Sequence, residues 1–230
     1  MRIEFPAHAL LRLLPFVSNE ETRYYLNGVK VEAKTCVATD CHRLGAISAA
    51  CTVDLDGTHF THAIVRPLKE LVAYAKKAIK LKPDAVIVLT GDSKRQTASF
   101  VLPIDPKAPD KDRSLGLPSF TDDFLIDGTF PDWVRALPTS DPATLIPVAD
   151  AFNAKCLGDF ALASRQRLEY PKTGTAVHVL SDSFGSPAWV FTNDADFVGV
   201  IMPIRTANPS VRPAWLPGAP AAAAEPLAAE

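Results

Sequence analysis

A repeated order of secondary structure, in which a strand and a helix precede three further strands, most constrains how this chain folds. The first copy is expected as a strand over 2–5, a helix beginning near Pro6 and strands over 22–32, 35–39 and 43–48. The second copy is expected as a strand over 59–65, a helix over 66–81 and strands over 85–90, 96–102 and 122–127. The third copy is expected as a strand over 144–148, a helix over 153–163 and strands over 176–180, 187–191 and 197–204.

Each copy has one helix whose apolar face needs a sheet to cover, so the repeat predicts an α+β fold. Pairs of β-α-β-β-β units are expected to form two-layer domains, in which the helices pack on antiparallel sheets. Three units leave one without a partner, and something must cover its exposed strand edge.

The chain is expected to divide into two structured regions and a tail. Residues 1–138 hold two units and are expected to form one two-layer domain, and residues 144–205 hold one unit, half of such a domain. The segment 206–230 has five prolines and an alanine run over 221–224, which is typical of a flexible tail. The Pro-rich, charged segment over 102–120 is expected to be a long surface loop.

Composition limits the class of protein. The chain is 47% hydrophobic, but no apolar run approaches the roughly 18 residues of a membrane span and no signal peptide is evident, so we expect a cytoplasmic protein that does not bind membranes. Lysine and arginine number 24 against 26 acidic residues, a net charge of −2, which excludes a globally basic nucleic-acid binder but not a local basic face. The four cysteines are interpreted as reduced thiols.

The helix expected over 66–81 has a basic face opposite an apolar one. Six basic residues lie between Arg66 and Lys82 against Glu70 alone, a local charge of 6 − 1 = +5. Five of them share an arc of about 100° on the helical wheel. These are Arg66, Lys69, Lys76, Lys77 and Lys80.

Most charged helix faces are simply exposed to solvent, but they usually carry both positive and negative side chains. On this face the charges are all positive, and like charges three or four residues apart repel each other by a few tenths of a kcal/mol per pair. DNA phosphates would remove that repulsion, so this face is a candidate for duplex DNA binding. The first and third helices are expected to expose Arg12 and Lys155, a weaker signal of the same kind.

The sequence gives little indication of a metal site or an enzyme active site. Cys36, Cys41 and His42 are close in sequence, but the C-x₄-C-H spacing differs from that of zinc fingers, so no metal is expected. No Gly-x-Ser-x-Gly elbow, phosphate-binding glycine loop or His-Glu-x-x-His helix occurs, and the aspartates lie at expected turns and strand ends, where this residue is common. We therefore expect a protein that is not an enzyme and needs no cofactor.

Four segments, in this order, resemble the bacterial DNA sliding clamp, the DNA polymerase III beta subunit. They are 21–28 (ETRYYLNG), 38–44 (ATDCHRL), 127–132 (DGTFPD) and 200–205 (VIMPIR). By this resemblance, residues 1–138 correspond to the family's middle domain and 144–205 to the second half of its last domain. The family's domains are each two β-α-β-β-β units, with helices on the inner face lining a DNA channel and antiparallel sheets outside. This agrees with the repeat found independently in the residues.

The chain departs from the family's pattern in several ways. The first domain and the first half of the third have no counterpart, and a Pro/Ala-rich segment follows Arg205. Cys41 stands where the family's motif normally has glycine, which puts the shape of that loop in question.

The resemblance also implies a hydrophobic cleft that captures short linear motifs of DNA polymerases and other clamp-binding proteins. Aliphatic and Met side chains in such a cleft would anchor apolar residues of the peptide. Several of the matching positions, such as Leu26, Leu44 and Val200, are alternatively ordinary core residues. The matching positions are Leu26, Thr39, His42, Arg43, Leu44, Leu137, Pro138, Val200, Met202, Pro203, Ile204 and Arg205.

Two functions are therefore expected from the sequence. The first is a clamp-like processivity or tethering factor that contacts duplex DNA without sequence specificity and binds partner peptides. The alternative is a clamp-like adaptor or decoy that binds partners without encircling DNA. Because the family's ring has twelve units and this chain has three, a homo-oligomer is expected, either a tetramer that closes a ring or a dimer that does not.

Overall fold

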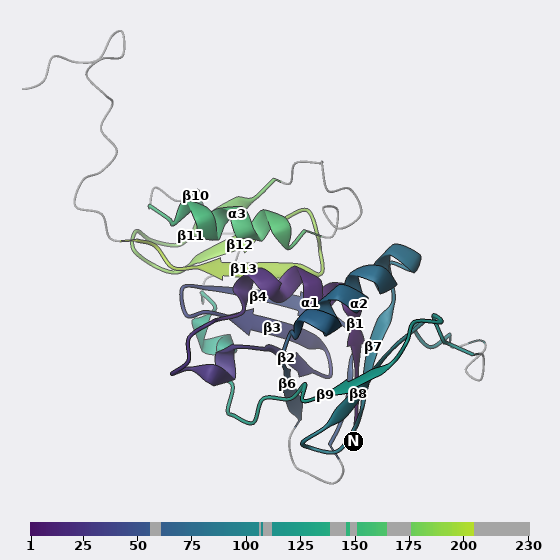
Figure 1. Ribbon diagram of the computed structural model, residues 1–230. Helices are drawn as coiled ribbons and strands as arrows, with labels where there is room; N and C mark the ends of the chain where they lie inside the picture. Colours follow the sequence, from purple (N-terminus) through teal and green to yellow (C-terminus); the bar gives the residue numbers. More distant parts are fainter. Residues whose placement is uncertain are drawn as a thin grey trace, which may run out of the picture.

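The computed structural model describes residues 1–55, 61–105, 107, 112–138, 146–147, 151–164 and 176–204, which form three α-helices and two antiparallel sheets (Figure 1). The helices are α1 (Ala7–Leu13), α2 (Lys69–Leu81) and α3 (Ala154–Leu162), with 3₁₀ turns η1 (Leu14–Phe16), η2 (Tyr24–Leu26) and η3 (Trp133–Ala136). The strands are β1 (Arg2–Pro6), β2 (Val29–Glu32), β3 (Thr35–Thr39), β4 (Arg43–Ser48), β5 (Thr52–Asp54), β6 (His62–Val65), β7 (Val86–Gly91), β8 (Gln96–Val101), β9 (Phe120–Asp122), β10 (Ile146–Pro147), β11 (His178–Ser181), β12 (Ala188–Phe191) and β13 (Phe197–Ile201).

The first two units exchange their first strands. The five-stranded sheet has the order β5-β1-β7-β8-β9, so β1 of the first unit joins strands of the second. In the eight-stranded sheet, β6 of the second unit pairs with β2 of the first. This exchange binds the two units together through backbone hydrogen bonds.

The third unit extends the eight-stranded sheet, whose order is β10-β11-β12-β13-β4-β3-β2-β6. Its last strand, β13, pairs with β4 over Phe197–Ile201, and its first strand, β10, pairs with its own β11. In each of the first two units, the second strand pairs with the first strand of the other unit: β2 with β6, and β7 with β1. In the third unit, the second strand β11 pairs instead with the unit's own first strand, β10.

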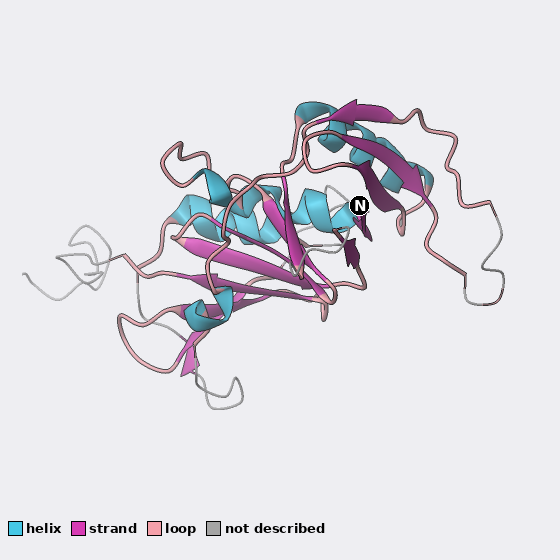
Figure 2. Cartoon of the chain, turned by 90° about the horizontal axis from the view of Figure 1, so that it is seen from below, coloured by secondary structure: helices cyan, strands magenta, loops and turns pink. Residues whose placement is uncertain are grey.

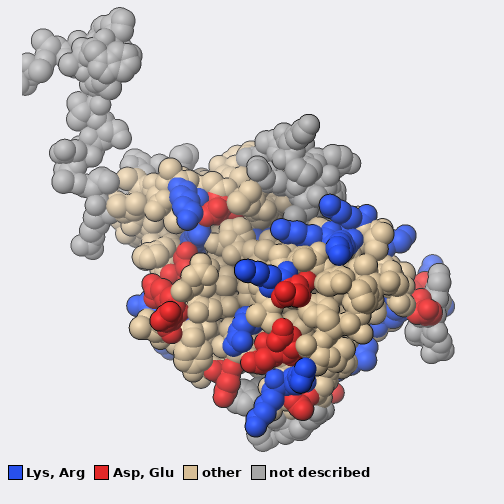
Figure 3. All heavy atoms as spheres, in the orientation of Figure 1, with Lys and Arg blue, Asp and Glu red and all other residues tan. Residues whose placement is uncertain are grey.

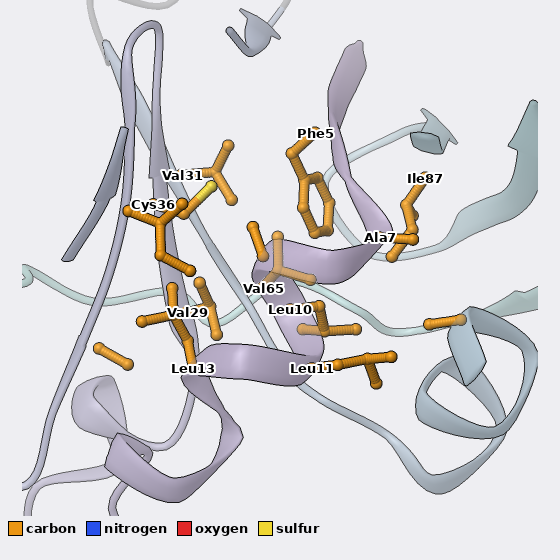
Figure 4. Packing of buried hydrophobic residues seen from close by; sticks show 14 of the residues in the cluster. Phe5, Ala7, Leu10, Leu11, Leu13, Val29, Val31, Cys36, Val65 and Ile87 are labelled. Atoms are coloured by element: carbon orange, nitrogen blue, oxygen red, sulfur yellow. The ribbon is translucent and has the colours of Figure 1, made fainter. Parts of the chain in front are cut away.

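The main hydrophobic core lies between the helices and the sheets. Helices α1 and α3 contact strands of the eight-stranded sheet, and α2 contacts α1 and β8 of the five-stranded sheet (Figure 2). Figure 4 shows side chains of α1 packed among residues of β1, β2, β3 and β7. Strand alternation directs Cys36 and Ala38 of β3 into this core and Val37 to the opposite face. A second apolar cluster, containing Leu26, Val37, Leu44 and Trp189, covers that outer face.

Several element boundaries differ from the sequence-based prediction. Tyr24–Leu26 form a 3₁₀ turn instead of the start of a strand, which brings Leu26 into the outer cluster. Helix α2 begins at Lys69 and not at Arg66, since Pro67 disfavours helical backbone at the residue before it. Strand β9 is shifted to Phe120–Asp122, and β5 was not predicted. The expected tail over 206–230 lies outside the described residues.

Candidate functional site

The basic face of α2 is the clearest concentration of positive charge on the side of the molecule shown in Figure 3. The helix buries Leu71, Ala75 and Ala78 and packs against α1. Its four lysines Lys69, Lys76, Lys77 and Lys80 are all exposed. Lysine Nζ groups on one exposed face form a surface suited to anionic ligands.

Few intramolecular contacts neutralise this charge. Within the described part of the chain, no ion pair involves Lys69, Lys76, Lys77 or Lys80, and the Nζ of Lys77 lies 4.6 Å from the centre of the Tyr74 ring. Arg66 precedes the helix and pairs with Asp123, with Nη1 and Oδ2 3.5 Å apart. The lysines are therefore available to an external anion, whereas Arg66 is partly neutralised.

Arg12 does not extend this face, and the expectation that it is exposed is wrong. Its side chain is 0% exposed, its Nη1 lies 2.7 Å from Oδ2 of Asp196, and its Nη2 lies 3.4 Å from Oδ2 of Asp194. Its Nε donates to the carbonyl oxygen of Ala163. The sequence pattern placed Arg12 opposite the leucines of α1, but the third unit covers that side of the helix. Arg12 is therefore a structural link between units.

Lys155 is exposed in the first turn of α3. The side chain of Asn153 caps this helix by accepting hydrogen bonds from the backbone N–H groups of Lys155 and Cys156. Asp159, one turn further on, binds Arg43. Because Asp159 binds Arg43, the side chain of Lys155 is left exposed on the surface of the third unit.

Several of the expected cleft residues lie together on the outer face of the eight-stranded sheet. Thr39 of β3 is directly opposite Leu44 of β4, and Leu44 is directly opposite Val200 of β13. Leu26 packs in the same buried cluster, and half-buried Leu137 packs against it. The set Leu26, Thr39, Leu44, Leu137 and Val200 thus lies together on the outer face of the sheet and comes from both structured regions, and we call it the outer row. Leu26, Leu44 and Val200 are at most 3% exposed, so these three are core residues of the outer cluster, as the alternative interpretation expected.

The rim of the outer row is more exposed. Met202 is 45% exposed and Ile204 is 46% exposed, and Pro138 and Pro203 are half-buried. The backbone N–H of Met202 donates to the carbonyl oxygen of exposed His42 over 2.9 Å, which holds the segment after β13 beside the β3–β4 turn. These contacts place an exposed thioether and an imidazole at one end of the outer row. Arg205 lies outside the described residues.

Arg43 does not belong to the outer row, contrary to the expectation. Because side chains alternate along a strand, Arg43 faces the opposite side of β4 from Leu44. Its side chain is 9% exposed, its Nε lies 3.1 Å from Oδ2 of Asp40, and its Nη2 donates to the carbonyl oxygen of Pro15 over 2.6 Å. Its Nη1 also binds Asp159 of α3. Burial lowers the pKa of Arg43, but the hydrogen bond to Asp159 and the negative charges of Asp40 and Asp159 outweigh burial and raise the pKa above its ordinary value.

The β3–β4 turn is built by the side chain of Asp40. Its Oδ1 accepts hydrogen bonds from the backbone N–H groups of His42 and Arg43, both over 3.0 Å. Cys41 has φ of 70°, the left-handed conformation that favours glycine, which is the residue that the sequence resemblance implied at this position. The turn therefore has a conformation suited to glycine although its residue is cysteine.

Trp189 was missed in the sequence analysis. It lies on β12 directly opposite Val200, so it continues the outer row by one strand, and it is 9% exposed. Its Nε1 is buried and has no hydrogen-bond partner among the described residues. The alternation of Trp189 and Phe191 with Ala188 and Val190 is the sequence signal that identifies the outer face of this strand.

In the portion of the chain that the structure describes, no helix has the length and apolarity to cross a membrane. Over the same portion, no group of three or more His, Cys, Asp or Glu side chains is placed to hold a metal ion.

Comparison with known proteins agrees with this architecture. The chain is 30% identical over 144 residues to the Beta sliding clamp of Haemophilus influenzae, an alignment that covers 59% of this chain and 33% of that protein. No family model matches the chain. The chain thus spans about one third of the curated relative that it matches.

Solved structures of sliding clamps have the same fold. A beta sliding clamp from Caulobacter crescentus matches with a TM-score of 0.55 at 20% identity, over 89% of this chain and 65% of that chain. A sliding clamp from Pseudomonas aeruginosa bound to griselimycin matches with a TM-score of 0.55 at 19% identity, over 90% and 66%. One from Thermotoga maritima matches with a TM-score of 0.55 at 14% identity, over 90% and 66%.

The fold is therefore that of the DNA sliding clamps, with three β-α-β-β-β units in the part of the chain that the structure describes. In sequence, the chain is similar over 144 residues to the bacterial beta sliding clamp, the DNA polymerase III beta subunit, across about one third of that protein's length.

Proposed function

We propose that this protein is a non-enzymatic, sliding-clamp-like tethering factor that contacts duplex DNA through α2 and binds partner peptides at the outer row. The proposal of DNA binding is supported by the basic face of α2. Its four lysines are exposed and make no ion pairs within the described residues; they are Lys69, Lys76, Lys77 and Lys80. Like charges at i,i+3 and i,i+4 repel in the free protein. DNA phosphates would remove this repulsion and release counterions, so binding would weaken as salt rises.

The outer row supports the second part of the proposal. Exposed Met202 and His42, at the end of the row formed by the buried side chains of Leu26, Leu44 and Val200, would offer contacts to a short peptide with large apolar side chains. The partner would be a DNA polymerase or another clamp-binding protein that carries such a linear motif. Lys155 would add a weaker DNA contact from α3, and Arg66 would contribute beside α2.

The assembly that we propose is a homo-oligomer. Four chains of three units supply the twelve units of a clamp ring (4 × 3), whereas a dimer would leave an open arc. Sedimentation or light scattering of the full chain, together with its retention on circular and linear DNA, distinguishes these arrangements. A stable monomer at tens of micromolar would contradict both.

The DNA-binding part is tested by charge reversal with a matched control. In the first variant, Lys69, Lys76, Lys77 and Lys80 are replaced by Glu. In the control, the exposed residues Lys34, Lys94, Arg95 and Arg135 are replaced by Glu, which changes the net charge equally at positions away from α2. Fluorescence anisotropy with a duplex at low salt should show binding lost in the first variant and retained in the control. Equal effects of the two variants would contradict a site on α2.

A second candidate function is an adaptor that binds partner peptides without encircling DNA. It is favoured by the pairing of β10 with β11 of the same unit, because this pairing covers a strand edge that assembly with another chain would otherwise have to cover. Unchanged peptide binding by a protein that has no measurable affinity for duplex DNA at low salt would support this function instead.

A further inference from the structure

Two cysteines of the first unit have their sulfur atoms in contact. The Sγ atoms of Cys36 and Cys51 are 3.7 Å apart, and both thiols are free. Cys36 lies on β3, where its side chain is buried among apolar residues of the main core (Figure 4). Cys51 is only partly buried and lies in the connection just before β5.

Backbone hydrogen bonds hold the two cysteines beside each other. The N–H of Cys51 donates to the carbonyl oxygen of Ala33, and the N–H of Ala49 donates to that of Lys34, both over 3.0 Å. Residues Ala33 and Lys34 connect β2 to β3, so the chain before β5 is fixed alongside the start of β3. A disulfide has sulfurs about 2.05 Å apart, so the two Sγ atoms would have to approach by only about 1.6 Å. Cys51 lies outside a strand, where side-chain and local backbone torsions can supply this movement.

The two thiols have unequal chemical character. The hydrogen bond between them raises the pKa of Cys36, which burial raises further, and it lowers the pKa of Cys51. The partly exposed Cys51 is therefore the thiol that ionises first and meets a dissolved reagent. Cys36 is positioned to react with it afterwards.

We infer that Cys36 and Cys51 form a reversible intramolecular disulfide on exposure to a small-molecule disulfide such as oxidised glutathione. The thiolate of Cys51 attacks one sulfur of glutathione disulfide, and a glutathione thiolate leaves. Cys36 then loses its proton and attacks the Cys51 sulfur of the mixed disulfide, which releases the second glutathione thiolate. Two protein thiols are oxidised, and one glutathione disulfide is reduced to two glutathione molecules.

The bond would connect the two sheets of the first two units. Cys36 belongs to β3 of the eight-stranded sheet, and Cys51 directly precedes β5, which pairs with β1 of the five-stranded sheet. A cross-link between residues 36 and 51 closes a short loop in the unfolded chain and so stabilises the folded state.

The test uses the full chain with Cys41 and Cys156 replaced by serine, which leaves only the Cys36–Cys51 pair. After incubation with excess oxidised glutathione, the mass should fall by two hydrogen atoms. Trypsin should then yield peptides 35–43 and 44–69 joined by a bond that dithiothreitol breaks, since Pro67 blocks cleavage after Arg66. The melting temperature should rise by roughly 6–12 °C and return on reduction.

Two variants in the same background keep the inference falsifiable. Cys51→Ser should neither lose the two hydrogens nor gain thermal stability, and Cys36→Ala should accumulate a glutathione adduct on Cys51. A lasting glutathione adduct in the parent without the cross-link, or a cross-link that forms only in urea, would overturn the inference.

Discussion

Gly45 of β4 and Gly199 of β13 are direct partners where the third unit joins the first, and each leaves room for a phenylalanine ring. A Cβ on Gly45 would lie 2.8 Å from Cδ2 of Phe16, and one on Gly199 would lie 2.7 Å from Cδ1 of Phe160. These two rings pack on each other with centroids 5.0 Å apart. The two glycines therefore let η1 and α3 approach the sheet closely at the junction between units.

Gly199→Ala should destabilise the protein by about 1–3 kcal/mol, because the added methyl group overpacks the site against a ring that is fully buried. Urea unfolding of the full chain measures the free energy. Gly158→Ala is the matched control, since a Cβ at that position on α3 meets nothing within 4 Å. An equal effect of the two substitutions would contradict the close approach of Phe160.

Arg12→Met should lower the free energy of unfolding by about 3 kcal/mol, because it leaves the carboxylates of Asp194 and Asp196 without their buried partner. This figure is the lower end of the range for buried pairs, since Asp196 is partly exposed. Affinity for duplex DNA should not change, since the side chain of Arg12 does not reach the surface. A stable variant that has lost DNA binding would contradict this placement.

Met202→Ala should weaken the binding of a peptide with two large apolar residues while changing the free energy of unfolding by less than about 1 kcal/mol, because Met202 is 45% exposed. Leu44→Ala should instead destabilise the fold by about 2–5 kcal/mol, because its side chain is buried in the outer cluster. Calorimetric titration and thermal unfolding of the two variants separate these effects. Unchanged peptide affinity of Met202→Ala would exclude this side chain from the site.

Acid should weaken the fold partly through Glu4. Burial alone would raise the pKa of Glu4, but hydrogen bonds from Arg113 and Arg2 outweigh it and lower the pKa below its ordinary value of 4.5. Because the pKa is lower in the folded state than in the unfolded state, this contribution is complete above about pH 4.5 and is lost as the pH falls through the folded value. Glu4→Gln should flatten the dependence of stability on pH below about 4.5. Parallel curves for the two proteins would contradict the assignment.

Local patterns identified much of the secondary structure. The strands over 35–39 and 43–48 follow from their β-branched and apolar residues, and the structure places both where they were predicted. The basic and apolar faces of α2 follow from helical periodicity, and the structure buries Leu71, Ala75 and Ala78 as expected. These features depend on residues close in sequence, so the sequence by itself determined them.

The tertiary structure alone decided which faces are covered and which strands are neighbours. Periodicity placed Arg12 on the polar side of α1, but it could not show that Asp194 and Asp196, far along the chain, would cover that side. Likewise, alternation separates Arg43 from Leu44, but only the pairing of β4 with β13 and of β13 with β12 brings Leu44, Val200 and Trp189 into one row. Such contacts form between segments distant in sequence, where packing and backbone hydrogen bonding select the partner and local propensity does not.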